Sequence, residues 1–408
     1  MAHRQMECTD IRIEGSRRVG AYCTDDKKYY PPTEGGRGMI PPLTEPGEKK
    51  KAMIAMSGGV DSSVAAYLTC LAGYDTVGVT MKLYDNGMID GCCSTCCSLS
   101  DIDEARSVAN RLGIKHYVFN FEDDFRREVV ERFIKAYEQG ATPNPCIDCN
   151  RYIKFKRLFR RGKELGRDYI VTGHYARVCY DAGSGRYLLK KAADKRKDQS
   201  YVLYSMNQEE LSHAMFPLGA VTKDETRRIA GEMGFVNAHK RDSQDICFVP
   251  DGDYSAFIRR QTGREYPPGD FVTTDGRVLG AHRGIINYTI GQRKGLGLAL
   301  PKPLYVVRKE PGTNRVVLAA NDELFSRELT ISDINWIACG APEQTLRLEV
   351  KIRYSQSAYS ARVVPTSETT ARIIFDEPVR AVTKGQAAVM YDADTVVGGG
   401  TIDWEYRL

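Results

Sequence analysis

One stretch of this chain constrains the fold more than any other, because an apolar run turns through two glycines into a second apolar run. Residues 52–56 (AMIAM) predict a buried strand, and residues 64–68 (VAAYL) predict a helix that Gly73 ends. Residues 57–63 (SGGVDSS) join the two. Such a turn directs backbone N–H groups and the positive end of a helix dipole at one point, which suits an anion such as phosphate.

The residues of this loop add to that expectation. Gly58 and Gly59 admit a positive φ or a close backbone approach that a side chain would block. The loop also carries three hydroxyls and a carboxylate that is placed to orient a nucleophile or hold Mg²⁺, namely Ser57, Ser62, Ser63 and Asp61. The lysine of the P-loop is missing. The motif S-G-G-x-D-S-S is instead similar to the pyrophosphate loop of the ATP pyrophosphatases, which activate a carbonyl oxygen by adenylylation. A plain glycine turn is the alternative.

The chain then alternates between strand and helix. Further strands are expected at residues 76–81, 117–119 and 169–172, and helices are expected from Ser100 and over residues 125–137. This order predicts an α/β fold, a doubly wound parallel sheet with its ligands at the carboxyl ends of the strands.

The remainder divides by its hydrophobic pattern. Residues 1–50 show little apolar periodicity and predict a mobile N-terminal extension, followed by an ATP-binding catalytic domain over residues 51–205. Residues 206–300 predict a helical linker, with helices over 209–215 and from Thr222, and a small central domain. Residues 301–408 have a period of two, without a break over 346–354, and predict a C-terminal β-barrel.

Composition indicates the cellular compartment and the kind of binding partner to expect. No apolar run reaches membrane-span length and no signal peptide is evident, so we expect a cytoplasmic protein without membrane contact. The 12 cysteines would then serve metals or chemistry more often than disulfides. Residues 151–199 hold 15 Lys/Arg against 5 Asp/Glu, which favours a polyanionic partner over a merely solvated helix face.

Three cysteines stand in polar loops. Cys146 and Cys149 follow two prolines in a stiff loop and precede a basic amphipathic helix, an arrangement that depresses thiol pKa values. Cys247 comes roughly a hundred residues later. A C-x-x-C pair alone is compatible with a redox pair, a zinc half-site or an iron–sulfur half-site. A denser cluster at residues 92–97 (CCSTCC) leaves open zinc binding, a sulfur relay or no function.

From about residue 51 to its C-terminus the chain resembles the tRNA-specific 2-thiouridylase family, which converts the wobble uridine of certain tRNAs to 2-thiouridine. The matching stretches are residues 57–63, 142–145 with 149–150, 153–155, 172–177, 197–201, 243–248 and 291–297. Together they are far more specific than the glycine loop.

The resemblance implies roles for individual residues. ATP would lie on Ala55, Met56, Ser57, Gly58, Gly59, Val60, Asp61 and Ser62, with adenine near Met81 and Gly173. Cys149, Cys247 and Cys146 would be the catalytic residues. The flipped-out uridine would be lined by Asn144, Pro145 and Cys146, and further tRNA contacts would come from His174, Lys197, Asp198, Gln199, Arg353, Tyr354 and Gln386.

The implied reaction has two steps. The 2-carbonyl oxygen of uridine attacks the α-phosphate of ATP, with Mg²⁺, and releases pyrophosphate; sulfur then displaces AMP. In one version a sulfur-donor protein loads Cys247 as a persulfide, and Cys149 ends in a disulfide with Cys247. Many family members have Asp where this chain has Cys146. The three thiolates would alternatively hold a [4Fe–4S] cluster with one open iron, and both versions remain open.

Two other functions fit part of the pattern. Another ligase of the ATP pyrophosphatase type would use the loop without needing Cys149 and Cys247. A tRNA-binding protein without thiolase activity would bind tRNA but release no AMP. The intact 57–63 loop favours an enzyme over the second alternative.

Overall fold

The computed structural model describes residues 50–84, 99–240, 242 and 246–403, which form two compact units. The first unit holds the described residues up to 126 together with 149–250 and 394–396, and the second holds 127–148, 251–393 and those from 397 onward. Three parts of the chain singled out above lie outside the described residues: the N-terminal extension up to residue 49, the cysteines of residues 92–97, and residues 243–245 of the Cys247 motif.

The first unit alternates strands and helices. Its strands are β1 (Lys51–Ala55), β2 (Asp75–Lys82), β3 (Lys115–Asn120), β4 (Tyr169–Val171), β5 (Ala176–Asp181), β6 (Arg186–Lys191) and β7 (Ala214–Met215). Its helices are α1 (Val60–Leu71), α2 (Leu99–Arg111), α3 (Glu122–Phe125), the π-helical segment η3 (Cys149–Leu158) with α6 (Phe159–Glu164), α7 (Gln208–Ser212) and α8 (Lys223–Glu232).

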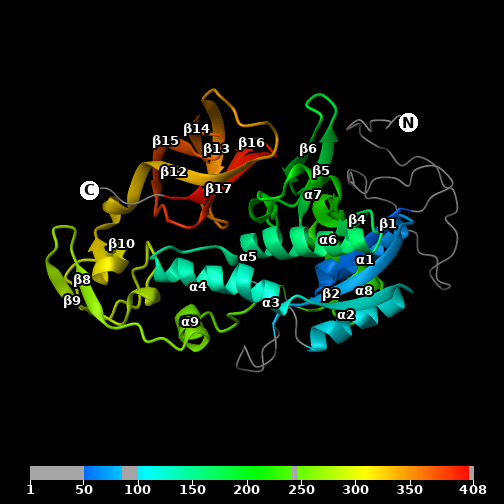
Figure 1. Cartoon of the computed structure of the whole chain (residues 1–408), viewed down its shortest axis with the longest axis horizontal. Helices are drawn as coiled ribbons and strands as arrows, with labels where there is room; N and C mark the ends of the chain where they lie inside the picture. The colour runs from blue at the N-terminus through cyan, green and yellow to red at the C-terminus, as the bar shows by residue number, and fades with distance from the viewer. Residues whose placement is uncertain (1–49, 85–98, 241, 243–245, 404–408) are drawn as a thin grey trace. The chain divides into compact units, whose positions relative to one another are not determined.

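Five of these strands form one parallel sheet in the order β3-β2-β1-β4-β7 (Figure 1). Successive side chains of β1 point to opposite faces. Ala52 and Ile54 pack in a core with α1, α2 and α8, while Met53 and Ala55 pack with Leu158 at the end of η3 and with the start of α6. Helices therefore cover both faces, and the predicted doubly wound sheet is confirmed.

Two boundaries differ from the sequence-based expectation. The helix expected over residues 209–215 ends at Ser212, and Ala214–Met215 forms the edge strand β7, because Met215 pairs with Val171 of β4. The helix expected to begin at Ser100 already includes Leu99, and the carboxylate of Asp101 accepts a bond from Lys240.

The second unit is mainly β-structure. Its helices are the π-helical segment η2 (Arg126–Val130) with α4 (Glu131–Glu138), α5 (Pro145–Asp148) and α9 (Tyr254–Thr262). Its strands are β8 (Gly269–Val272), β9 (Val278–His282), β10 (Tyr305–Glu310), β11 (Arg315–Ala319), β12 (Phe325–Trp336), β13 (Leu346–Lys351), β14 (Tyr359–Pro365), β15 (Ala371–Arg380), β16 (Ala387–Asp392) and β17 (Thr395–Ile402).

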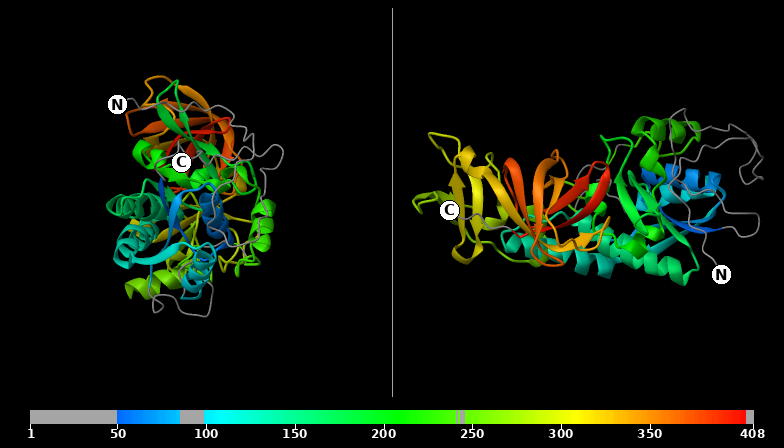
Figure 2. Two further views of the ribbon diagram at one scale, coloured as in Figure 1. Left: turned by 90° about the vertical axis from the view of Figure 1, so that its right-hand side faces the viewer. Right: turned by 90° about the horizontal axis from the view of Figure 1, so that it is seen from above.

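The strands of the second unit make a small sheet and a barrel. β10, β11, β8 and β9 form a four-stranded sheet in that order. β12, β15, β14, β13, β16 and β17 follow one another round a six-stranded barrel, which the pairing of β12 with β17 closes (Figure 2). The C-terminal barrel is therefore confirmed.

The barrel begins later than residue 301. β10 and β11 belong to the four-stranded sheet, because β11 runs parallel to β8 with Val316 opposite Phe271. The alternation over residues 346–354 also gives a shorter strand than expected, since β13 ends at Lys351. In the described parts of the chain, no helix has the length and apolar character needed to cross a membrane.

Candidate active site

The turn between β1 and α1 leaves the helix N-terminus without a side-chain cap. Gly59 is the N-cap residue, with an extended backbone at φ −89° and ψ 158°. Gly58 has φ +72°, and a Cβ atom there would lie 2.6 Å from the carbonyl oxygen of Asp101. Gly58 is thus required for its backbone conformation and its close approach to α2, and the uncapped helix end at Gly59 suits a phosphate.

The serine hydroxyls of the loop hold the turn together. Ser62 Oγ and Ser63 Oγ each donate to the carbonyl oxygen of Gly59, at 2.9 and 3.0 Å. Ser62 Oγ also accepts the N–H of Ser57 at 3.2 Å. A hydroxyl has one proton to donate, so in this arrangement these two serines shape the loop, and the backbone N–H groups are left as its main donors for an anion.

A side chain from the turn that follows α8 supports the same loop. Asn237 is 2 % exposed, and its Nδ2 donates to the carbonyl oxygen of Gly58 at 2.8 Å and to Ser63 Oγ at 2.9 Å. One amide group therefore fixes both sides of the turn.

The strand ends beside the loop are where the adenine was expected. β1 lies between β2, which carries Met81 near its carboxyl end, and β4, which Gly173 follows. A Cβ atom on Gly173 would lie 2.8 Å from the backbone nitrogen of Ser62. The backbone after β4 is thus in contact with the first turn of α1, at the carboxyl edge of the sheet.

Asp61 belongs to a network of charges. Its Oδ1 accepts from Lys223 Nζ at 2.6 Å and from the Tyr175 hydroxyl at 2.9 Å. Lys223 Nζ also lies 2.7 Å from Oδ1 of Asp242, and Lys197 Nζ is 2.8 Å from the other oxygen of that carboxylate. Burial would raise the pKa of Asp242, but the bonds from Lys197 and Lys223 outweigh it and lower the pKa.

His174 is buried beside the 57–63 loop, and both of its ring nitrogens face protein groups. Lys154 Nζ lies 3.4 Å from Nε2, and Thr172 Oγ1 lies 2.7 Å from Nδ1. Burial, and then the Lys154 ammonium, hold the pKa of His174 well below its usual range. An ammonium only donates, so Nε2 is the acceptor, and Nδ1 carries the proton of the neutral ring.

Cys149 begins η3, and the next turns of that segment are fixed in the first unit. Asn150 is buried, and its Nδ2 donates to the carbonyl oxygen of Val202 at 2.9 Å. The Phe155 ring packs 6.1 Å from the His174 ring, which follows β4. Cys149 thus stands on an element anchored at the carboxyl end of β4.

Cys247 is anchored on the other side of β1. The hydroxyl of Tyr84, just after β2, donates to the Cys247 carbonyl oxygen at 3.4 Å. Phe248 is buried with its ring centroid 5.7 Å from that of Phe125. The two thiols therefore belong to segments that flank the 57–63 loop in the strand order β2-β1-β4.

None of the cysteines that the structure describes forms a disulfide, Cys146, Cys149 and Cys247 among them. Cys146 is exposed on α5 of the second unit. Within the described ranges, no three His, Cys, Asp or Glu side chains come together as metal ligands.

The 197–199 stretch, expected to contact tRNA, makes internal bonds. Lys197 pairs with Asp242, and Asp198 accepts from the Ala192 N–H and the Ser200 hydroxyl. Gln199 Oε1 accepts the N–H of Tyr175 at 2.9 Å. The stretch supports Tyr175 and, through it, Asp61.

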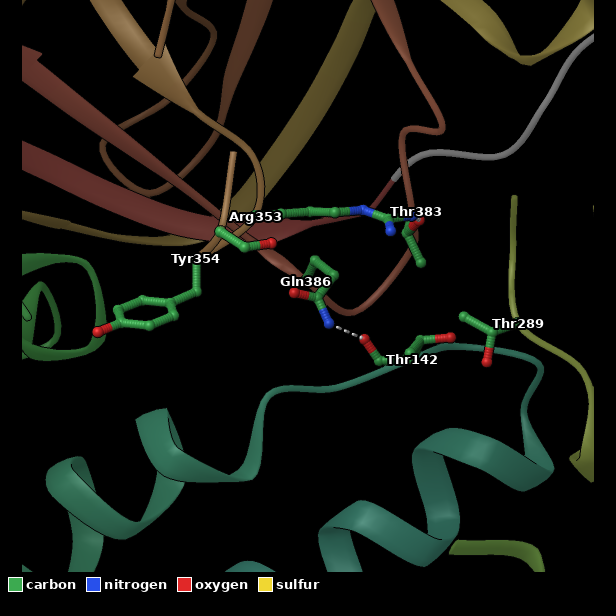
Figure 3. A pocket seen from close by; sticks show the side chains of 7 residues that line it. Thr142, Thr289, Arg353, Tyr354, Thr383 and Gln386 are labelled. Carbon is green, nitrogen blue, oxygen red and sulfur yellow. Dashed lines mark hydrogen bonds between the residues drawn. The ribbon is translucent and has the colours of Figure 1, made fainter. Parts of the chain in front are cut away.

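In the second unit, Arg353, Tyr354 and Gln386 line one pocket of about 210 Å³ (Figure 3). Gln386 Nε2 donates to the Thr142 carbonyl oxygen at 2.7 Å, two residues before Asn144. Arg353 Nη2 donates to Thr383 Oγ1 at 2.7 Å. The structure thus brings these three expected contacts together with the loop that leads to Asn144, Pro145 and Cys146.

Sequence analysis missed several residues that support the site. The pattern around Thr222 predicted a helix start, and its capping box with Glu225 is present, but nothing in the pattern pointed to Lys223 as a partner of Asp61. Tyr175 lay inside a matching stretch without a role. Asn237 had no local signal, because it meets the loop only through tertiary contacts.

Comparison with known proteins agrees with this description. Residues 50–251 match a family described as the tRNA methyl transferase HUP domain, residues 255–320 its PRC-barrel domain, and residues 326–402 the aminomethyltransferase β-barrel domain. A parallel sheet with this loop after its central strand thus defines a nucleotide-binding HUP domain of the ATP pyrophosphatase type, followed by two β-domains.

The relatives narrow the class to a family. The tRNA-specific 2-thiouridylase MnmA of Clostridioides difficile (strain 630) is 49% identical over 87% of this chain and 98% of its own length. That of Acetivibrio thermocellus is 50% identical over 87% of this chain and 99% of its own length. The chain belongs to the tRNA-specific 2-thiouridylase MnmA family. A solved structure, the U34-tRNA thiolase NcsA from Methanococcus maripaludis with its [4Fe-4S] cluster, covers 52% of this chain and 66% of its own, with 21% identity and a TM-score of 0.31, too low to support a conclusion.

Proposed function

We propose that this chain catalyses the ATP-dependent 2-thiolation of the wobble uridine of tRNA. One observation carries the proposal. The phosphate-binding turn follows β1, while segments anchored at the neighbouring ends of β2 and β4 carry Cys247 and Cys149. An activating site and two thiols at one edge of a sheet suit a reaction that first adenylylates an oxygen and then replaces it by sulfur.

In the first step the uridine 2-carbonyl oxygen attacks the α-phosphate of ATP, and the bond to the β-phosphate breaks to release pyrophosphate. The uncapped N-terminus of α1 and the backbone of Gly58 and Gly59 would hold the phosphates. Gly173 lets the backbone after β4 reach this turn. Adenylylation is needed because a carbonyl oxygen is a poor leaving group, whereas AMP is a good one.

In the second step sulfur forms a bond to C2 and AMP leaves. We assign the sulfur to a persulfide on Cys247, supplied by a sulfur-donor protein. Cys149 attacks Cys247 Sγ, so the S–S bond to the transferred sulfur breaks, that sulfur stays on the base, and a Cys149–Cys247 disulfide forms. A dithiol reductant must then supply two electrons to restore both thiols.

Binding of tRNA is proposed for two surfaces, each within one unit. In the second unit the pocket of Arg353, Tyr354 and Gln386, with Asn144, Pro145 and Cys146 nearby in sequence, would contact the anticodon loop. In the first unit the basic residues of η3 surround an aromatic ring, because Arg151 and Lys156 lie 5.5 and 5.7 Å from the centroid of Tyr152. Loop bases are recognised by stacking and edge contacts, and cations add a salt-dependent attraction.

The test is mass spectrometry of tRNA nucleosides after incubation of the full chain with unmodified tRNA, ATP, a dithiol and polysulfide, whose sulfane sulfur can load a thiol as a persulfide without an oxidant. We expect 2-thiouridine that depends on ATP and forms together with AMP. Release of AMP without 2-thiouridine would point to another ligase, and tRNA binding without AMP to a binding protein. An absorption spectrum after anaerobic purification distinguishes the cluster version, because a [4Fe–4S] protein is coloured and a persulfide enzyme is not.

A further inference from the structure

A buried lysine joins the loop of residues 57–63, called the ATP loop below, to the segment that carries Cys247. The Lys223 side chain is 6% exposed, and its Nζ lies 2.6 Å from Asp61 and 2.7 Å from Asp242. Asp61 belongs to the ATP loop, and Asp242 precedes Cys247 in the sequence. We refer to Asp61, Lys223 and Asp242 as the Lys223 bridge.

The lysine itself is held in place. It is the first residue of α8, whose capping box is formed by Thr222 and Glu225. The Lys223 N–H donates to Asp194 Oδ2 at 3.2 Å, and Asp194 is in turn bonded to Arg196. The side chain therefore leaves a fixed backbone, so the position of its ammonium is set by the fold and not by its ligands alone.

Asp242 receives more positive charge than the bridge alone provides. Lys197 lies 2.8 Å and Arg227 3.0 Å from its oxygens, in addition to Lys223. Three cations on one carboxylate fix it strongly. Burial would raise the pKa of Asp242, but the bonds from Lys197 and Lys223 outweigh burial and lower that pKa. On the other side of Cys247, Tyr84 holds its carbonyl oxygen and Phe248 is buried against Phe125.

We propose that Asp242 and Lys223 are positioning residues for sulfur transfer, because Lys223 ties Asp242, five residues before Cys247, to Asp61 of the ATP loop. This inference rests on the proposed function. Lys223 touches both ends of the bridge, so its loss would affect both reaction steps. Asp242 is bonded to Lys223 and not to Asp61. Loss of its charge should therefore disturb the position of the Cys247 thiol while adenylylation continues.

The decisive variant is Asp242→Asn, which keeps the shape and removes the charge. We measure two rates on the full chain with unmodified tRNA: tRNA-dependent pyrophosphate release without a sulfur source, and 2-thiouridine formation with polysulfide, a sulfane-sulfur donor, and a dithiol. We expect pyrophosphate release within about twofold of the parent chain and 2-thiouridine formation slower by about tenfold or more, as misplaced reacting groups cost rates of that order. Asp242→Glu should restore most of the lost rate, which a merely structural role does not require.

Two further variants complete the test. Asp224→Asn on the same helix is the matched control, because Asp224 is 82% exposed and pairs only at the surface with Arg196; both rates should stay unchanged. Arg227→Gln removes one exposed partner of Asp242 and should reduce 2-thiouridine formation in the same direction by about threefold. It keeps the inference testable if Asp242→Asn does not fold.

The results distinguish a failure of the positioning role from a failure of the proposed 2-thiolation function. If Asp242→Asn slows both rates equally, or neither, the positioning role is wrong even though the parent chain thiolates tRNA. If the parent chain releases no tRNA-dependent pyrophosphate and forms no 2-thiouridine, the proposed function itself fails.

Discussion

A Cβ atom on Gly173 would lie 2.7 Å from the carbonyl carbon of Asp61, so the chain after β4 touches the first turn of α1 backbone to backbone. This contact explains why a glycine stands at the end of the strand next to β1. The adenine is expected at the end of β4. The contact places this strand end directly against the turn that would hold the phosphates.

We therefore expect Gly173→Ala to separate these two segments. The added methyl group cannot be accommodated without a backbone shift, which should destabilise the fold by about 1–3 kcal/mol and raise the KM for ATP by about tenfold or more. Thermal unfolding and steady-state kinetics measure the two effects. Gly231→Ala is the control, because nothing lies within 4 Å of its added Cβ and it is inside α8; it should stabilise the chain by about 0.5–1 kcal/mol.

Asn237 offers a test of the loop support that the sequence did not indicate. In Asn237→Asp the side chain keeps its shape but loses the N–H groups that bond Gly58 and Ser63, and a carboxylate would then face a carbonyl oxygen. We expect a loss of about 2–4 kcal/mol in the free energy of unfolding and weaker ATP binding. Calorimetry of nucleotide binding checks the second effect, and an unchanged affinity would show that the loop does not depend on this amide.

The two thiols should act only after activation. Cys149→Ser and Cys247→Ser should each reduce 2-thiouridine formation by about a thousandfold, because a hydroxyl is neither a persulfide carrier nor a nucleophile toward one. Pyrophosphate release with tRNA should persist in both variants. Cys339→Ser, in the second unit outside the proposed site, is the control and should leave both rates unchanged. Full thiolation by Cys247→Ser would rule out the persulfide step.

A buried lysine in the second unit should make stability depend on pH. Lys309 is 8% exposed, with Nζ 5.4 Å from the Tyr137 ring centroid, and burial lowers its pKa from 10.5 to about 7. The pKa of Tyr137 is raised, mainly by burial and also by Tyr254, so its hydroxyl stays neutral over the same range.

Between about pH 7, the pKa of Lys309 in the folded chain, and pH 10.5, its ordinary pKa, the unfolded chain binds a proton that the folded chain does not. The free energy of unfolding therefore rises with pH across that window. The slope is at most about 1.4 kcal/mol per pH unit. Lys309→Met should flatten this part of the profile and be more stable than the parent chain near neutral pH. Denaturant unfolding between about pH 7 and about pH 9 measures the difference. Lys302→Met, at an exposed lysine of the same unit, should leave the slope as it is.

Local patterns predicted the elements that depend on nearest neighbours in sequence. The apolar run of β1, the glycines of the 57–63 loop and the capping box at Thr222 each act within a few residues, so their structures could be read from the chain. The strand β7 could not be predicted in this way, because two residues are too few to show a periodic pattern. Only the pairing with β4 makes these residues a strand. The start of the barrel was placed too early for a similar reason, since β10 has a strand pattern but its partner is chosen by the fold.

The sequence by itself determined the kind of site: a strand–glycine–helix turn for a phosphate, and thiols in polar loops distant along the chain. Tertiary structure decided which side chains hold that turn and where the thiols stand. Asn237, Lys223 and Tyr175 reach the loop from residues more than a hundred positions away, and Tyr84 fixes Cys247 across a similar separation. Bonds across such separations leave no local periodicity, because they depend on the packing of whole elements and not on the residues beside them.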